Sequence, residues 1–263
     1  MYMRYFIECA YKGTQYSGWQ IQNNSLTVQA EIEKALSTLL KHKVDITGSS
    51  RTDAGVHAVQ QIAHFEMTKE ISDCENLVFR MNKLLPFDIS VQKIFNVTND
   101  YHARFEAISR KYEYRISRKK NPFQRGLAYE FNGNINIDSM NEACKILFRH
   151  LDYQCFSKIH TDVLTFNCTI TEAHWEEKEE NLLIFSIKAN RFLRGMVRAI
   201  VGTFLEVGLG KISLSAFEEI ILSKDRKKAG RAVPAAGLFL MEVNYGICVT
   251  SSMNNWIRYG KCT

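Results

Sequence analysis

The sequence contains no long uninterrupted apolar run, which excludes the membrane proteins that span a bilayer as helices. Its first residues, MYMRYFIECAY, alternate like a strand and lack the charged start and apolar block of a secretory signal. Of the 263 residues 46% are hydrophobic, which is enough for a sizeable core. We therefore expect a soluble, cytoplasmic, globular protein with no membrane partner.

No C-x-x-C pair occurs among the seven cysteines, which are odd in number and widely scattered. They are expected to be reduced thiols, as is usual in a cytoplasm. Histidines such as His57 and His64 also lack a ligand pattern with a neighbouring cysteine or carboxylate. We predict neither a structural zinc nor any other metal.

A G-x-S-x-G motif is also absent, which disfavours a small-molecule hydrolase or isomerase built on a Ser–His–Asp or Cys–His set. No Pro/Gly/Ser-rich linker and no low-complexity segment divides the chain. If the chain forms two lobes, we expect them to be packed tightly.

Positive charge is present in moderate excess and is unevenly distributed. The net charge is +6 and the pI is about 8.9. Much of this charge lies in three runs, at Ser109–Arg125, Asn190–Arg198 and Ser223–Arg231. One such run alone is typical of a solvated face, but three runs interleaved with aromatic residues favour a polyanionic partner such as nucleic acid.

Hydrophobic periodicity predicts the order β-α-β-β-α-β in the first half of the chain. Alternation at residues 3–9 indicates a strand, and a 3.6-residue stripe indicates a helix that starts near Thr27. A short strand into Gly48, a strand through VQQIAHFEM, a helix near 76–85 and the strand DISVQKIFNV follow.

The second half repeats this order, with the strand RKYEYRIS, a helix near 138–147, two further strands, helices and a last strand LFLMEVNY. Ser215 and Glu218 form a candidate capping box for one of these helices. The count predicts an α+β protein with two ferredoxin-like, split β-α-β lobes that have antiparallel sheets. We expect lobes at 1–104 and 105–263.

The stretch GSSRTDAGVHA, at 48–58, is the first candidate for a functional loop. Gly48 and Gly55 bound a segment in which Arg51 and Asp53 suit no core position. Charged residues fixed on a loop by a scaffold often carry function. The local pattern alone, however, favours an aspartate that caps a turn or pairs with Arg51.

Three other segments carry candidates that are ambiguous alone. In RKYEYRI, Tyr112 and Tyr114 share one strand face, as in a half-buried strand or in a π-face on which a base stacks. Arg198 borders an apolar helix stripe, either as a surface arginine or as a guanidinium at the rim of a cleft. The segment GRAVPAAGLFL indicates a loop that closes onto a strand.

The order and wording of these segments together resemble the tRNA pseudouridine synthases of the TruA family. The resemblance covers nearly the whole chain, through YKGTQYSGWQIQ, SRTDAGVHA, AHF, YHARFEAISRKYEYRI, FLRGMVRAIVGTF and PAAGLFL, and RTDAGVHA is its most specific block. It implies isomerisation of uridine to pseudouridine at positions 38, 39 and 40 of the tRNA anticodon stem-loop, without a cofactor, by a homodimer.

The resemblance also implies roles for individual residues. Asp53 matches the catalytic carboxylate, Arg198 the guanidinium that keeps it ionised and oriented, and Tyr112 the ring that stacks on the extruded uracil, with Tyr114 as a fallback. Arg51 matches the residue that fills the space left by the flipped base, and Leu238 matches an apolar position of the uracil pocket.

This chain also departs from the family pattern. It has Ser50 before Arg51, and Gly195 and Ala199 where His and Asn are common. Ala232, Val233, Pro234 and Ala235 stand where the family has TAPA. None of these changes removes a catalytic candidate, so they affect the expected substrate range more than the reaction type. The sequence does not choose between attack of the carboxylate at C6 of the base and chemistry at ribose C1′.

A second hypothesis is a non-catalytic RNA-binding protein on the same fold. Such a protein would keep the basic runs and the tyrosines but would not need the aspartate beside Arg51. Because Asp53, Tyr112 and Arg198 all occur, we favour the enzyme. The preferred tRNAs and the preferred uridine among the three lie beyond this sequence.

Overall fold

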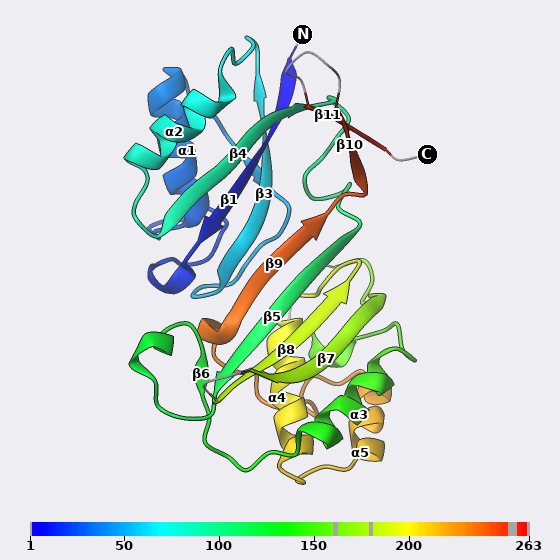
Figure 1. The fold of residues 1–263 in the computed structure, drawn as a ribbon. Coiled ribbons are helices and arrows are strands. Elements are labelled where there is room, and N and C mark those ends of the chain that lie inside the picture. Colours follow the sequence, from blue (N-terminus) through cyan, green and yellow to red (C-terminus); the bar gives the residue numbers. More distant parts are fainter. Residues whose placement is uncertain (1, 160–162, 179–180, 252–256, 262–263) are drawn as a thin grey trace. The chain divides into compact units, whose positions relative to one another are not determined.

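A computed structural model describes residues 2–159, 163–178, 181–251 and 257–261, with the backbone alone at 247–251 and 257–261. The chain forms two compact units (Figure 1). Unit 1 comprises Met1–Ile108 and Leu240–Thr263, and unit 2 comprises Ser109–Phe239. Helices combine with mostly antiparallel strands, which confirms the predicted α+β class.

Unit 1 contains the predicted β-α-β-β-α-β order. Its elements are β1 (Met3–Tyr11), α1 (Val28–Leu40), β2 (Thr47–Gly48), β3 (His57–Met67), α2 (Cys74–Leu84) and β4 (Ile89–Val97), followed at the end of the chain by β10 (Ile247–Ser251) and β11 (Ile257–Lys261). Strand β1 pairs antiparallel with both β3 and β4, and Ile7 lies opposite Ala63 on one side and Ile94 on the other.

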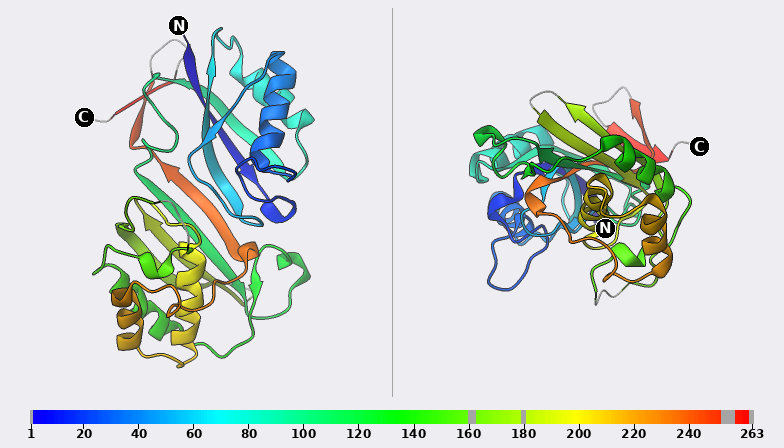
Figure 2. Two further views of the ribbon diagram at one scale, coloured as in Figure 1. Left: turned by 180° about the vertical axis from the view of Figure 1, so that it is seen from behind. Right: turned by 90° about the horizontal axis from the view of Figure 1, so that it is seen from below.

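The helices of unit 1 cover one face of its sheet, as Figures 1 and 2 show. The alternation that predicted β1 places Tyr5, Ile7 and Cys9 in the core, where each is almost fully buried. The helical stripe of α1 buries Ile32 and Leu36 completely. Helix α2 begins at the cap Asp73, whose carboxylate accepts a hydrogen bond from the Asn76 amide.

Unit 2 repeats this two-layer arrangement with three helices. Its elements are β5 (Ser109–Ser117), β6 (Tyr129–Glu130), α3 (Ile137–Leu147), β7 (Ile170–Lys178), β8 (Leu182–Ala189), α4 (Met196–Gly208) and α5 (Leu214–Ser223). Strand β8 pairs antiparallel with β5 and β7, so Tyr112 lies opposite Ile187, and Phe185 lies opposite both Tyr114 and Trp175. Strand β9 (Leu238–Asn244) has its first two residues in unit 2 and the rest in unit 1.

An aromatic cluster forms the core of unit 2. The ring centroids of Trp175 and Phe185 are 4.9 Å apart, those of Phe185 and Phe204 5.3 Å, and those of Phe204 and Phe217 5.2 Å. These separations are within the range in which aromatic pairs contribute beyond simple area burial. The cluster joins β7 and β8 to α4 and α5, and so fixes the helix that carries Arg198.

The division between the units differs from the expected boundaries of 1–104 and 105–263. The first unit continues to Ile108, and the chain returns to it after Phe239. Long-range hydrogen bonds explain the return, because the Val243 amide donates to the Gln60 side chain, and the Tyr245 hydroxyl donates to the Ala103 carbonyl. Period-two alternation in the last strand could not reveal partners so distant in sequence.

The capping box predicted for Ser215 and Glu218 is wrong. Helix α5 begins at Leu214, and its cap is Ser213, whose hydroxyl accepts a hydrogen bond from the Ala216 amide at 3.1 Å. Ser215 therefore already lies in the first turn. The Glu218 carboxylate instead lies 3.0 Å from the His150 ring nitrogen.

Candidate active site

The segment at 48–56 forms a loop that is fixed at both ends. At its start, the Ser49 amide donates to the Ile62 carbonyl at 2.7 Å, and the Gln61 side-chain amide donates to the Ser50 carbonyl at 2.8 Å. At its end, the Val56 amide donates to the Asp53 carbonyl at 3.1 Å and closes a four-residue turn. Gly55 occupies the third position of this turn with a φ of +79°, which favours glycine.

Side chains alternate in direction along this loop. Arg51 is exposed, Thr52 is buried and Asp53 is half-buried. The Thr52 hydroxyl forms a 2.8 Å hydrogen bond with the hydroxyl of the buried Tyr11, and the Thr52 carbonyl accepts one from the Trp19 amide. The buried threonine therefore anchors the loop, and its charged neighbours point away from the core.

Two glycines of the YKGTQYSGWQIQ motif make the support of this loop possible. Gly18 has a φ of +97°, and a β-carbon built there would lie 2.5 Å from the Thr52 carbonyl oxygen. A β-carbon on Gly13 would overlap the Val56 carbonyl. Only glycine lets these two backbones approach so closely. The motif was found in the sequence, but its support of the aspartate loop was not deduced from it.

In unit 2, β5 presents its two tyrosines differently. Tyr114 is fully buried, and its hydroxyl donates to the Pro234 carbonyl at 2.7 Å. Burial raises the pKa of this phenol well above its ordinary value. Tyr112 retains 9% exposure and packs edge-on against Phe192 at a centroid distance of 5.0 Å. Tyr114 therefore has no open ring face, and Tyr112 is the better stacking candidate of the two.

Arg198 is held by reciprocal hydrogen bonds between α4 and the following loop. Its side-chain Nε donates to the Val233 carbonyl at 2.7 Å, and the Val233 amide donates to the Arg198 carbonyl at 3.2 Å. The Nε contact fixes the plane of the guanidinium, because all its nitrogens are coplanar. Arg198 is thus an oriented side chain and not a flexible surface arginine.

Close backbone contact brings that loop to α4. A β-carbon on Gly202 would overlap the Arg231 carbonyl oxygen, and one on Gly230 would lie 2.8 Å from the Gly202 carbonyl carbon. Thr203 adds a polar link, because its hydroxyl donates to the Ala199 carbonyl and accepts from the Gly230 amide. The position of Arg198 therefore depends on two glycines that carry no chemistry.

Leu238 opens β9 directly after a 3₁₀ turn at Ala235–Gly237 and is 7% exposed. A β-carbon on Gly237 would lie 2.7 Å from the Arg115 carbonyl, so the turn lies directly against β5. Leu238 consequently belongs to the same unit as Tyr112 and Arg198, whereas Asp53 and Arg51 lie together on the loop of unit 1.

The family departures occupy well-defined places in unit 2. Gly195 precedes α4 with a φ of +73°, and no atom lies within 4 Å of the position its β-carbon would take. Ala199 and Val233 are buried, at 1% and 6% exposure. Ala199 lies on α4, one residue after Arg198, and Val233 lies in the loop whose carbonyl accepts the Arg198 hydrogen bond.

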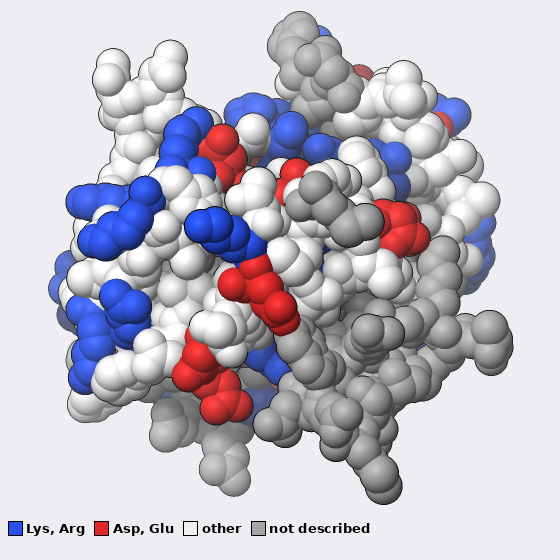
Figure 3. Space-filling view, turned by 90° about the horizontal axis from the view of Figure 1, so that it is seen from above, with Lys and Arg blue, Asp and Glu red and all other residues white. Residues whose placement is uncertain are grey.

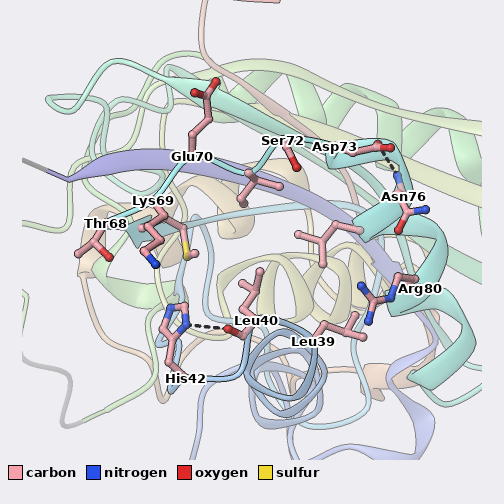
Figure 4. Close-up of a pocket in the computed structure, with 13 residues that line it drawn as sticks. Leu39, Leu40, His42, Thr68, Lys69, Glu70, Ser72, Asp73, Asn76 and Arg80 are labelled. Atoms are coloured by element: carbon pink, nitrogen blue, oxygen red, sulfur yellow. Dashed lines mark hydrogen bonds between the residues drawn. The ribbon is translucent and has the colours of Figure 1, made fainter.

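A separate hollow of unit 1 measures about 470 Å³ and lies between the end of α1, the end of β3 and the start of α2 (Figure 4). Its rim carries both signs of charge, with Lys69 and Arg80 opposed by Glu70 and Asp73. None of the five predicted site residues lines it. This pocket therefore has no part in the chemistry predicted from the sequence.

Charge divides unequally between the units. Unit 2 contains 21 of the 34 Lys and Arg residues and 15 of the 28 Asp and Glu residues, so it carries the entire net charge of +6 and unit 1 carries none. All three basic runs lie in unit 2. Seen from above, the described surface carries both cationic and anionic side chains (Figure 3).

Thiol chemistry is disfavoured by the surroundings of the cysteines. The five whose side chains the structure describes, Cys9, Cys74, Cys144, Cys155 and Cys168, are free thiols. Burial raises the pKa of Cys155 to about 12 and that of Cys168 to about 11, so both are protonated at neutral pH. Cys262 lies outside the described residues, and Cys248 is described by its backbone alone.

Within the described part of the chain, no group of three or more His, Cys, Asp or Glu side chains is arranged to hold a metal ion. Across the same residues, every helix is too short or too polar to cross a bilayer.

Similarity to known proteins extends over most of the chain. The family described as tRNA pseudouridine synthase matches residues 9–106 and 143–246, and so includes Asp53, Arg198 and Leu238. A tRNA pseudouridine synthase A of Parabacteroides distasonis is 50% identical over 92% of this chain and 96% of its own length. The corresponding proteins of Bacteroides fragilis and Bacillus subtilis are 48% and 38% identical, over 92% of this chain and 96% and 99% of theirs.

These matches confirm the resemblance found in the sequence and favour the enzyme over a non-catalytic RNA-binding protein. The chain belongs to the tRNA pseudouridine synthase family, whose members are isomerases that convert uridine to pseudouridine in tRNA.

Proposed function

We propose that this enzyme isomerises the uridines at positions 38, 39 and 40 of the tRNA anticodon stem-loop, with Asp53 as the catalytic carboxylate. The observation that carries this proposal is the loop of unit 1, which holds a half-buried aspartate in a backbone frame built on Gly13 and Gly18. A rigid frame suits a carboxylate that must meet one atom of a nucleoside.

The reaction breaks the bond between uracil N1 and ribose C1′, rotates the base and joins its C5 to the same C1′. The hydrogen on C5 leaves as a proton, and N1 gains one, so the isomerisation is balanced without an oxidant or a cofactor. The ionised Asp53 carboxylate can serve as nucleophile at base C6 or act at C1′. Both routes require it to be unprotonated and next to the extruded nucleoside.

We assign Arg198 as the cation that keeps Asp53 ionised and oriented. The assignment is supported by the Nε hydrogen bond to Val233, which fixes the plane of the guanidinium. A guanidinium beside a carboxylate favours its charged form.

Tyr112 and Leu238 are assigned to the uracil pocket. Tyr112 is wedged edge-on against Phe192, so its ring has a fixed orientation for stacking on a base. Leu238 supplies an apolar contact at the start of β9. Arg51, which is exposed next to the anchored Thr52, is assigned to the space that the flipped base vacates in the stem.

At the level of the whole molecule, the two units are proposed to be ferredoxin-like lobes with the active-site cleft between them. The enzyme is proposed to act as a cytoplasmic homodimer, in which one subunit binds the body of the tRNA while the other presents its cleft. Light scattering at working concentration tests this assembly, and a monomer would remove it.

Tritium release from tRNA labelled at uridine C5 tests the catalytic assignment. The wild type should release tritium, and Asp53→Asn should lower the rate at least 10⁴-fold, because it keeps the shape of the side chain but removes its negative charge. Chemical mapping of pseudouridine in the product should place it at 38, 39 or 40. Asp45→Asn, on the same unit but outside the loop, is the matched control and should keep wild-type activity.

Tritium release by Asp53→Asn at the wild-type rate would show that another group does the chemistry. Pseudouridine at other tRNA positions would preserve the catalytic assignment and refute the site specificity.

A further inference from the structure

The turn between β5 and β6 carries an aromatic side chain that the proposed active site does not use. Phe123 is 89% exposed, although phenylalanine is a residue that proteins usually bury. It lies in the 3₁₀ turn Pro122–Gln124, within the segment that Figures 1 and 2 show looping out beyond the end of β5. An exposed ring on a projecting turn is a candidate contact for a partner.

The turn is ordered by its own hydrogen bonds and not by burial of the ring. The Asn121 side-chain oxygen accepts from the Phe123 amide at 3.0 Å, and the Asn121 carbonyl accepts from the Gln124 amide at 3.1 Å. Pro122 restricts the backbone further, because its ring fixes φ. The backbone that carries Phe123 is therefore already ordered, so a partner that binds the ring does not need to order the turn.

Both ends of the segment are attached to β5. Strand β6 runs parallel to the end of β5, with Tyr129 opposite Ile116, and the Ser117 hydroxyl donates to the Lys119 carbonyl at 2.6 Å. These contacts place the base of the turn on a rigid strand. They also connect the turn to the strand that carries Tyr112. Phe123 therefore belongs to the same unit as Tyr112, the candidate ring for stacking on uracil.

Cationic residues flank Phe123 in the sequence. Lys119, Lys120 and Arg125 are all exposed, and within the described residues none of them forms an ion pair. Three cations and one open aromatic face within seven residues match the two parts of an unpaired nucleotide, which are its phosphates and its base.

We propose that the turn Arg118–Leu127 is an RNA-binding element, in which Phe123 stacks on an unpaired base of the tRNA while Lys119, Lys120 and Arg125 contact the adjacent phosphates. The proposal depends on tRNA as the substrate, and it does not depend on any residue of the proposed active site. Phe123 is thus a binding residue and takes no part in the chemical step.

Phe87 offers a matched control in the same chain. It also follows a proline, Pro86, and is 99% exposed, but the next residue is Asp88, whose carboxylate accepts a hydrogen bond from the Tyr16 hydroxyl. The nearest preceding cation, Lys83, lies over the ring of Phe79 instead. The two prolyl-phenylalanine sites therefore share exposure and differ in their surrounding charge.

The experiment compares Phe123→Ala with Phe87→Ala in two measurements. Filter binding uses product tRNA, already converted by wild-type enzyme, so that no turnover occurs, and tritium release gives kcat and KM. Phe123→Ala should raise Kd and KM about tenfold, since loss of one base–aromatic stack costs that order of affinity, and should leave kcat unchanged. Phe87→Ala should match the wild type in every value.

Conservative variants separate stacking from simple apolar contact. Phe123→Trp should keep wild-type affinity, and Phe123→Leu should behave like Phe123→Ala, because only the tryptophan keeps a π-face. The double variant Lys119→Gln, Lys120→Gln should reduce the slope of log K against log salt by about 2, because each lysine that no longer neutralises a phosphate lowers the slope by about 1.

Three results would overturn the proposal. Equal affinities of Phe123→Ala and Phe87→Ala would show that the ring does not contact RNA, and wild-type Kd and KM of Phe123→Leu would show that stacking is not involved. A lower molar mass of Phe123→Ala in light scattering would show that Phe123 contacts a second copy of this chain. None of these measurements depends on which group performs the chemistry, so they stand even if Asp53→Asn keeps its activity.

Discussion

The two units have the same two-layer construction but differ in charge. Unit 1 is neutral and carries the candidate carboxylate, whereas unit 2 holds the whole net charge of +6 and carries the candidate stacking ring and guanidinium. The difference indicates that the two units contribute separately, unit 2 to the attraction of RNA and unit 1 to the chemistry. A cationic unit attracts the phosphate backbone, and a carboxylate on a neutral unit does not weaken that attraction.

The units also share a device, which is a close backbone approach permitted by glycine. In unit 1, Gly18 allows one loop to support another, and Asp53 lies on the supported loop. In unit 2, Gly202 allows a loop to approach a helix, and Arg198 is oriented by that loop. The atoms nearest to both β-carbon positions belong to the backbone, so each glycine acts through the backbone.

Of the substitutions that test the comparison between the units, those of these two glycines should have the largest effect on stability and activity. Gly18→Ala and Gly202→Ala should each destabilise the protein by about 3 kcal/mol, because a β-carbon collides with a carbonyl group, and Gly18 also loses its favoured φ. Each should lower kcat/KM about 100-fold, since small displacements of reacting groups are costly.

Thermal unfolding and tritium release measure these two effects. Gly210→Ala is the control, because Gly210 also has a positive φ, of +69°, but no atom lies within 4 Å of its β-carbon position. It should lose about 1 kcal/mol and keep its activity. Wild-type stability of Gly18→Ala or Gly202→Ala would show that the surrounding backbone yields easily and that the shared device does not position the site.

Arg51→Ala should produce a smaller effect that depends on the substrate. If Arg51 fills the gap left by a flipped base, turnover should fall about tenfold more for a uridine in a paired stem than for one in an unpaired loop, because flipping from a stem costs a few kcal/mol more. Initial rates on two labelled RNAs measure this ratio. Equal losses on both RNAs would instead indicate a plain phosphate contact, of the kind expected from unit 2.

The order of elements could be predicted from the sequence because it depends on local periodicity. The stripe of α1 and the alternation of β1 and β5 follow directly from side-chain spacing. The return of residues 240–246 to unit 1 could not be predicted, because it rests on bonds such as that between Val243 and Gln60, which are 183 residues apart. The predicted cap of α5 was wrong because Ser213 and Ser215 lie two residues apart and either serine could cap the helix.

Sequence motifs identified the candidate residues, but only the structure revealed the residues that hold them in place. Nothing local in RTDAGVHA reveals that Thr52 is anchored by Tyr11 and that Gly18 lies against its carbonyl. Likewise, the exposure of Phe123 is visible only once the chain is folded, because a phenylalanine in NPFQR is equally consistent with a core residue.

The smallest effect is expected at Gly195, where this chain departs from the family pattern. Gly195→Ala should cost about 1 kcal/mol, or roughly 2 °C in Tm, because a side chain must adopt a φ of +73° in otherwise open space. Arg198 lies one turn further on and stays bound to Val233, so kcat/KM should change less than twofold. A tenfold loss of activity in Gly195→Ala, with Gly210→Ala unchanged, would mean that the start of α4 contacts the tRNA itself. Unit 2 would then recognise its substrate through backbone as well as charge.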